Sequence, residues 1–109
     1  MAIKANLQID QGTHFSTTID VTDDDGNIVN LTGYTGMAQM RKHYTSSSQT
    51  AFTVSISALL GEVTLSMNAA TTGTITAGRY VYDCELASSS NVVSRLIEGI
   101  VSVSPQVTR

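Results

Sequence analysis

Short stretches of alternating apolar and polar residues run along most of the chain. The clearest one covers residues 78–86, with four apolar residues on one side and three charged residues on the other: Tyr80, Tyr82, Cys84 and Leu86 against Arg79, Asp83 and Glu85. A period of two is typical of a β-strand with one face in the core and the other in solvent. We expect this strand to carry much of the core, because it holds two of the chain's four tyrosines.

The same alternation predicts further strands before and after this one. They are expected near residues 5–9, 15–21, 36–42, 52–56, 63–67 and 92–103, with a brief extension at 28–29. Turns rich in glycine, serine, asparagine and aspartate separate them, and residues 68–74 could form one helical turn. Strands at spacings of roughly 8 to 14 residues are typical of a β-sandwich. The pattern therefore predicts a single all-β domain over residues 1–109, with seven or eight strands.

The last predicted strand breaks its own alternation. Ile97 and Val101 share one face, whereas Leu96 and Ile100 lie on the opposite face. A β-bulge at Gly99 would turn part of the strand back to the core. Alternatively, both faces are covered, the outer one by another subunit. Both explanations stay open, and under the second one Leu96 and Ile100 form a subunit contact.

Composition limits the partners and the compartment. Only 14% of the residues are charged, and the formal net charge is −3 with a pI near 5.0. This balance predicts no binding of nucleic acid or of an anionic membrane. The N-terminal residues lack the apolar run of a signal peptide, and no stretch is long enough to span a bilayer. We expect synthesis in the cytoplasm, no disulfide, and a buried, unreactive Cys84.

No combination of residues predicts a catalytic, metal or cofactor site. The acidic run Asp23–Asn27 fails the spacing of a calcium loop in either register, so a solvated β-turn is favoured. His14 and His43 have no partner at a metal-ligand spacing. Asp83 and Glu85 project from a strand face that also bears an arginine, which favours a solvated surface over acid–base chemistry. We therefore expect a protein that is not an enzyme and holds neither metal nor cofactor.

One segment resembles the tyrosine corner of immunoglobulin-like domains. It is Thr76–Tyr82, in which Tyr80 takes the corner position and Tyr82 the place of the second disulfide cysteine. The chain has no tryptophan and a single cysteine, so the resemblance concerns architecture. It implies that the predicted fold is an immunoglobulin-like antiparallel β-sandwich.

A second resemblance covers nearly the whole chain and rests on turn and strand segments. In order, they are residues 9–15 (IDQGTHF), 25–26 (DG), 30–34 (NLTGY), 39–42 (QMRK), 61–63 (GEV), 78–83 (GRYVYD), 98–99 (EG) and 105–108 (PQVT). This series resembles small virion structural proteins of tailed phages, especially cyanobacterial and marine phages. It is also similar to the N-terminal domain of siphophage upper baseplate proteins.

The phage resemblance implies a non-enzymatic structural protein of the virion, either a capsid decoration protein or a component of the tail or baseplate. Its partners would be other phage structural proteins in a symmetric, multi-copy assembly. The alternative is a receptor- or carbohydrate-binding module of a tail fibre. Such a module needs exposed aromatic side chains, and Tyr34 and Tyr44 are the tyrosines outside the predicted core.

Overall fold

Eight strands make up most of residues 3–108, which are the residues that the computed structural model describes. Two single-turn helices, η1 and α1, lie in the connections. In chain order the elements are β1 (Ile3–Lys4), β2 (Leu7–Asp10), β3 (Phe15–Asp20), β4 (Thr35–Arg41), β5 (Thr50–Ser57), η1 (Ala58–Leu60), β6 (Glu62–Met67), α1 (Ala69–Thr72), β7 (Gly78–Ala87) and β8 (Val93–Ser104).

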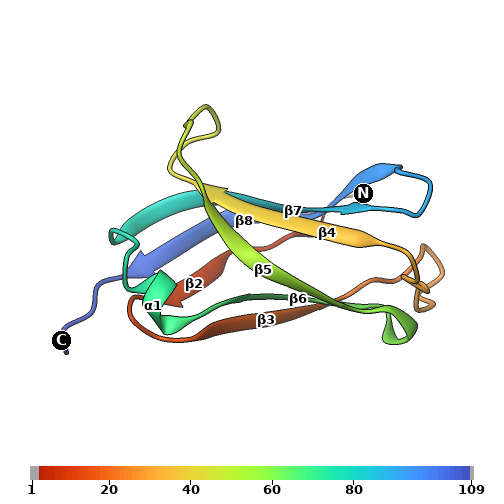
Figure 1. Ribbon diagram of the computed structural model, residues 1–109, viewed down its shortest axis with the longest axis horizontal. Helices are drawn as coiled ribbons and strands as arrows, with labels where there is room; N and C mark the ends of the chain where they lie inside the picture. Colours follow the sequence, from red (N-terminus) through yellow and green to blue (C-terminus); the bar gives the residue numbers. More distant parts are fainter. Residues whose placement is uncertain (1–2, 109) are drawn as a thin grey trace.

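The strands form two stacked layers, and Figure 1 shows them with the long axis of the molecule horizontal. The larger sheet contains β1 and β2, both paired with β8, followed by β7, β4 and the first residues of β5. The smaller sheet contains the rest of β5, then β6 and β3. Strand β5 thus crosses from one layer to the other. The predicted immunoglobulin-like β-sandwich is confirmed, with eight strands in the described part of the chain.

The strands pair antiparallel except at one edge, where β1 and β2 join β8 in parallel. Both pair with the same register offset, so they are two parts of one edge strand, interrupted at Ala5 and Asn6. Asn6 bridges the interruption, because its side-chain oxygen accepts a hydrogen bond from the Ile100 amide at 3.1 Å. A Cβ atom on Gly99 would lie 2.0 Å from the Ala5 carbonyl oxygen. Gly99 is therefore needed for this close backbone approach.

The β-bulge in β8 lies at Leu96, so the prediction of a bulge at Gly99 is wrong. The register with β7 shifts between Cys84 and Glu85, and Leu96 is the extra residue on the β8 side. The shift turns Leu96 into the core, where it is 7% exposed. Leu96 therefore does not share an outer face with Ile100, and their interpretation as an exposed pair is wrong. Ile100 alone stays at the surface, 39% exposed.

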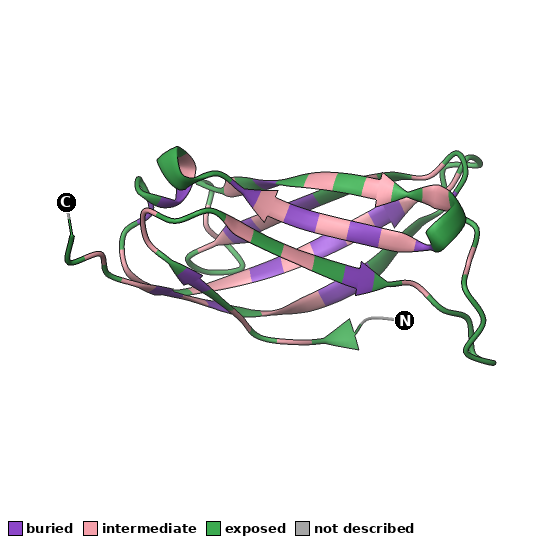
Figure 2. Cartoon of the chain, turned by 90° about the horizontal axis from the view of Figure 1, so that it is seen from below, coloured by how far each residue is buried: buried purple, intermediate pink, exposed green. Residues whose placement is uncertain are grey.

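The core lies between the two layers, and Figure 2 shows buried positions alternating with more exposed ones along the strands. Tyr82 is 4% exposed and packs edge-on against Phe52, with ring centroids 6.2 Å apart. The Tyr80 hydroxyl donates a hydrogen bond to the Thr76 carbonyl oxygen at 2.5 Å. This bond back to a residue upstream is the tyrosine corner that the sequence predicted.

Candidate functional site

The residues considered for chemistry do not come together. Within residues 3–108, no group of three histidine, cysteine or acidic side chains is placed to hold a metal ion. Asp23 closes the expected turn, since its Oδ1 accepts hydrogen bonds from the amides of Asp25 and Asn27, both at 2.9 Å. His14 and His43 are exposed. Neither helix of the described chain is long and apolar enough to cross a membrane.

Cys84 is fully buried in the larger sheet, as predicted. Burial, together with the charges of the neighbouring Asp83 and Glu85, raises the pKa of its thiol to about 11. The thiol is therefore protonated at neutral pH and inaccessible to reagents, which is the state of an inert core cysteine.

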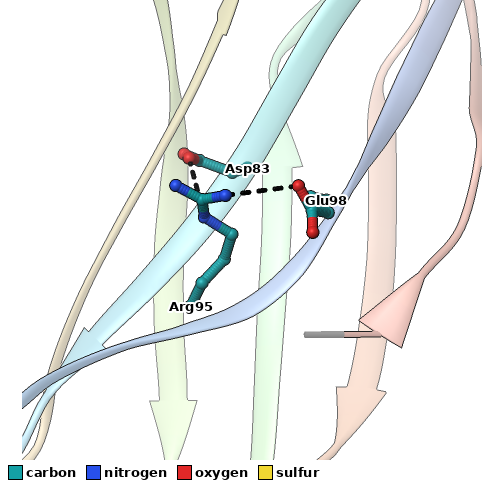
Figure 3. Close-up of polar contacts among 3 residues, drawn as sticks. All are labelled: Asp83, Arg95 and Glu98. Atoms are coloured by element: carbon teal, nitrogen blue, oxygen red, sulfur yellow. Dashed lines mark hydrogen bonds and ion pairs between the residues drawn. The ribbon is translucent and has the colours of Figure 1, made fainter. Parts of the chain in front are cut away.

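The outer face of the larger sheet carries a small network of charges. Arg95 lies between two carboxylates, with its Nε 3.4 Å from Asp83 and a terminal nitrogen 3.3 Å from Glu98 (Figure 3). All three side chains are partly exposed, so these ion pairs contribute little to stability. The structure therefore confirms the prediction that Asp83 lies on a solvated face of the sheet.

A depression of about 250 Å³ lies beside this network, and Tyr44 lines one side of it. Tyr44 is 83% exposed, whereas Tyr34 packs against the core. Arg41 also lines the depression and donates hydrogen bonds to the Ser46 carbonyl and to the Gln39 side chain. Of the two tyrosines proposed for ligand stacking, the structure thus leaves Tyr44 accessible, next to polar groups.

A second surface lies at the end of the sandwich where β1 begins. Ten large apolar residues are exposed in the described chain, and six of them lie at this end: Ile3, Ile28, Leu59, Leu60, Val92 and Val93. We call this surface the apolar end. It is formed by the start of β1, the β3–β4 connection, the η1 turn and the β7–β8 turn, and Figure 1 shows the three connections at the same end of the molecule, with the β3–β4 connection between the other two. Exposed apolar groups concentrated in one place mark an interaction surface.

Hydrogen bonds join the β3–β4 connection to the η1 turn at the apolar end. The Val21 amide donates to the Gly61 carbonyl at 2.7 Å, and the Leu31 amide donates to the Ala58 carbonyl at 3.0 Å. Ile28 packs over Gly61, where a Cβ atom would lie 2.5 Å from the Ile28 side chain. The apolar side chains are therefore presented on a bonded backbone framework and not on a free loop.

A groove of about 460 Å³ opens at the same end, between β1, the end of β3 and the start of β8. Its walls are largely apolar and include Leu31 and Leu96 from the core. Asp20, Asp23 and Asp24 also line it. Arg95 lines it as well, so the groove combines largely apolar walls with charged groups of both signs.

The sequence pattern did not reveal the apolar end, although two signals were present. Leu59 and Leu60 occur where a turn was predicted, and Val92 and Val93 follow a serine-rich turn. Turns are usually polar, so paired apolar residues in them indicate a contact surface. Only the fold shows that these separate turns lie at the same end of the molecule.

No family model and no curated protein matches the chain. Among solved structures, the sandwich is similar to part of an internalin-like protein of Listeria monocytogenes, lmo2027, with a TM-score of 0.53 and 13% sequence identity. The match covers 94% of this chain but 28% of that protein, so the chain spans little more than a quarter of its neighbour's length. At this identity the likeness supports the fold alone.

Proposed function

We propose that the chain is a non-enzymatic structural protein of a phage virion, an immunoglobulin-like module held in the particle by protein–protein contacts. It would be a capsid decoration protein or a component of the tail or baseplate. The observation that carries the proposal is the apolar end, which presents Leu59 and Leu60 at 78% and 58% exposure on a bonded framework. The phage resemblance of the sequence supplies the kind of particle.

The energetics favour burial of this surface in an assembly. Five of its side chains, at positions 28, 59, 60, 92 and 93, are each more than half exposed. Burying such side chains is worth about 1 kcal/mol or more apiece, on the order of 5 kcal/mol together, before the entropy of association is subtracted. One contact of this size is weak, but many copies at symmetric positions act together.

Mass spectrometry of purified particles tests the proposal. The virus that encodes the chain is grown, its particles are banded on a density gradient, and the chain is quantified against the major capsid protein. We expect a fixed copy number per particle. The matched variant replaces both Leu59 and Leu60 with serine, and it should fold normally yet be lost from particles. Particles that lack the wild-type chain would contradict the proposal.

The alternative function is a carbohydrate- or receptor-binding module, and one observation favours it. Tyr44 stands exposed beside a depression that offers arginine, glutamine and carboxylate groups. Aromatic faces combined with polar side chains suit the binding of small polar ligands. A glycan array with the wild-type domain and with Tyr44→Ala tests this alternative. Binding that Tyr44→Ala abolishes would support it, and an array without any signal would speak against it.

A further inference from the structure

The smaller sheet ends in a strand whose outer edge is free. Strand β3 pairs with β6 on one side, through an unbroken antiparallel register from Phe15 to Asp20. On its other side, no strand of the described chain pairs with it. Figure 1 shows β3 along the lower border of the molecule, and Figure 2 views the molecule from that side. An edge strand presents a row of backbone N–H and C=O groups that no neighbouring strand satisfies.

The hydrogen-bond pattern identifies the backbone groups that face outward. The Val21 amide donates to the Gly61 carbonyl at 2.7 Å, one step beyond the last pair of the β3–β6 register. Because bonded pairs alternate along an antiparallel ladder, the odd-numbered residues of β3 direct their backbone groups toward β6. Those of Ser16, Thr18 and Asp20 point away from β6, and no hydrogen bond within residues 3–108 reaches them.

The β3 edge lacks the features that usually prevent strands from pairing between molecules. It contains no proline, lysine or β-bulge. The edge of the larger sheet differs, because it is interrupted at Ala5 and Asn6 and carries Lys4 and Asp10. Of these two edges, β3 is the one that offers an uninterrupted template for another strand.

Strand β3 is complementary to itself in the antiparallel direction. With a two-fold axis at Thr17, Phe15 of one copy lies opposite Ile19 of the other on the core side of the sheet. Ser16 lies opposite Thr18 on the outer side, and the outward backbone groups of these two residues bond each other. Apolar side chains thus meet apolar ones and hydroxyls meet hydroxyls. The two smaller sheets become one continuous sheet.

The charged groups near this edge favour the antiparallel arrangement. Asp20 lies at the apolar end of β3 with Glu62 beside it, and Asp23–Asp25 follow in the next connection. Parallel pairing would bring these carboxylates against those of the second copy, which is unfavourable. Antiparallel pairing separates the two acidic groups. It also sets Asp20 opposite His14 of the second copy, whose imidazole can donate a hydrogen bond to a carboxylate.

The charges of the neighbouring edge are compatible with this arrangement. In the larger sheet, Lys4 on β1 lies at the apolar end, and Asp10 on β2 lies at the opposite end. The two-fold axis therefore brings Lys4 of each copy to the end that carries Asp10 of the other. Arg95 lines the groove at the apolar end, but its guanidinium contacts Asp83 and Glu98 on the outer face of the larger sheet. Arg95 therefore takes no part in the contact.

We propose that β3 pairs antiparallel with β3 of a second copy and forms a two-fold symmetric dimer. Such a contact uses the same surface on both subunits, so it closes at two copies. The inference goes beyond the proposed function, because the β3 edge and the apolar end are separate surfaces. Antiparallel pairing places the two apolar ends at opposite ends of the dimer, where both stay open to neighbours in a particle.

Sedimentation velocity of the full chain tests the dimer. Thr18→Lys places a charge in the outward-facing row, and Ser55→Lys is the matched control, because Ser55 is exposed in the same cross-strand row two strands further in. We expect the wild type to dimerise as its concentration rises. Thr18→Lys should raise the dimer Kd about tenfold or more, and Ser55→Lys should leave it unchanged. Equal Kd values for the two variants would overturn the proposal. A wild type that stays monomeric up to its highest soluble concentration would also overturn it, and the edge would then be open to a strand of a different protein.

Single cysteines test the register of the pairing. Thr17→Cys places the two thiols at the two-fold axis, where Cβ atoms of directly opposite residues lie about 4.5–5.5 Å apart. The native Cys84 is buried and does not compete. We expect Thr17→Cys to cross-link about tenfold faster than Ser55→Cys, because a disulfide needs this close approach. Equal cross-linking rates would refute the antiparallel pairing at Thr17.

The variant with serine at both Leu59 and Leu60 separates the dimer from the proposed function. It should dimerise like the wild type, since the apolar end takes no part in the β3 contact, and it should still be lost from particles. If this variant is monomeric while the wild type dimerises, association runs through the apolar end and the β3 dimer is wrong. The virion role is decided separately, by the copy number of the wild-type chain in particles.

Discussion

Replacing Leu96 by alanine tests the position of the β-bulge, on which the arrangement of β8 depends. Leu96 is 7% exposed and belongs to the core cluster, whereas Ile100, four residues later on the same strand, is 39% exposed. Truncating a buried leucine to alanine costs roughly 2 to 5 kcal/mol of unfolding free energy. Leu96 also lines the open groove, where neighbours and water can relax around the truncated side chain. We therefore expect the lower part of this range, about 2–3 kcal/mol.

Ile100→Ala is the matched control, because it removes a similar side chain from the exposed side of the same strand. Its expected cost is about 1 kcal/mol or less, since much of the side chain already contacts water. Urea unfolding followed by circular dichroism gives both values, provided that the dependence on urea is the same for each variant. The difference between the two variants should therefore be about 1–2 kcal/mol.

Equal costs for the two variants would refute this reasoning. That result would mean that Leu96 is no more buried than Ile100, as in a strand without a bulge at Leu96. A larger cost for Ile100→Ala would reverse the assignment of the two faces of β8. Small and equal costs would restore the interpretation of both residues as an exposed subunit contact.

Three further predictions concern the backbone and the buried groups. Gly99→Ala should destabilise the domain by at least about 2 kcal/mol, because its Cβ would collide with the Ala5 carbonyl. Urea unfolding measures this cost, and a neutral effect would contradict the close approach of the Ala5 backbone to Gly99. Tyr80→Phe should cost about 1 kcal/mol in thermal unfolding, through loss of its bond to Thr76, and an unchanged melting temperature would contradict the tyrosine corner. The Cys84 thiol has a pKa near 9.0 in the unfolded chain and about 11 in the fold, so the wild type should lose up to about 3 kcal/mol as pH rises through this window. Cys84→Ala should lack that part of the loss, and a pH profile identical to that of the wild type would contradict the burial of the thiol.

The strands were predictable because each presents one face to the core and the other to solvent. The alternation at Tyr80–Leu86 located β7, and the tyrosine at the corner position located its characteristic hydrogen bond. The same alternation cannot tell which residue of an interrupted strand is the additional one. For that reason the bulge was placed at Gly99, whose actual role is to accommodate the backbone of Ala5.

The parallel edge and the apolar end depend on contacts between distant parts of the chain. Nothing local to Leu7 indicates that its strand lies beside β8 in parallel and not antiparallel beside β3. The apolar residues at positions 28, 59, 60, 92 and 93 lie in three separate connections or directly after one, and their location at the same end follows from the sandwich topology. A surface assembled from three turns could therefore not be predicted from the sequence.

In the proposed function, the sandwich buries its apolar end against a neighbouring subunit. The most direct measurement is the cryo-electron microscopy density of the intact particle, with the sandwich fitted as a rigid body. We expect density for each copy with Leu59 and Leu60 in contact with a neighbouring subunit. Density that places the apolar end in open solvent, with the copy attached through another surface, would contradict it.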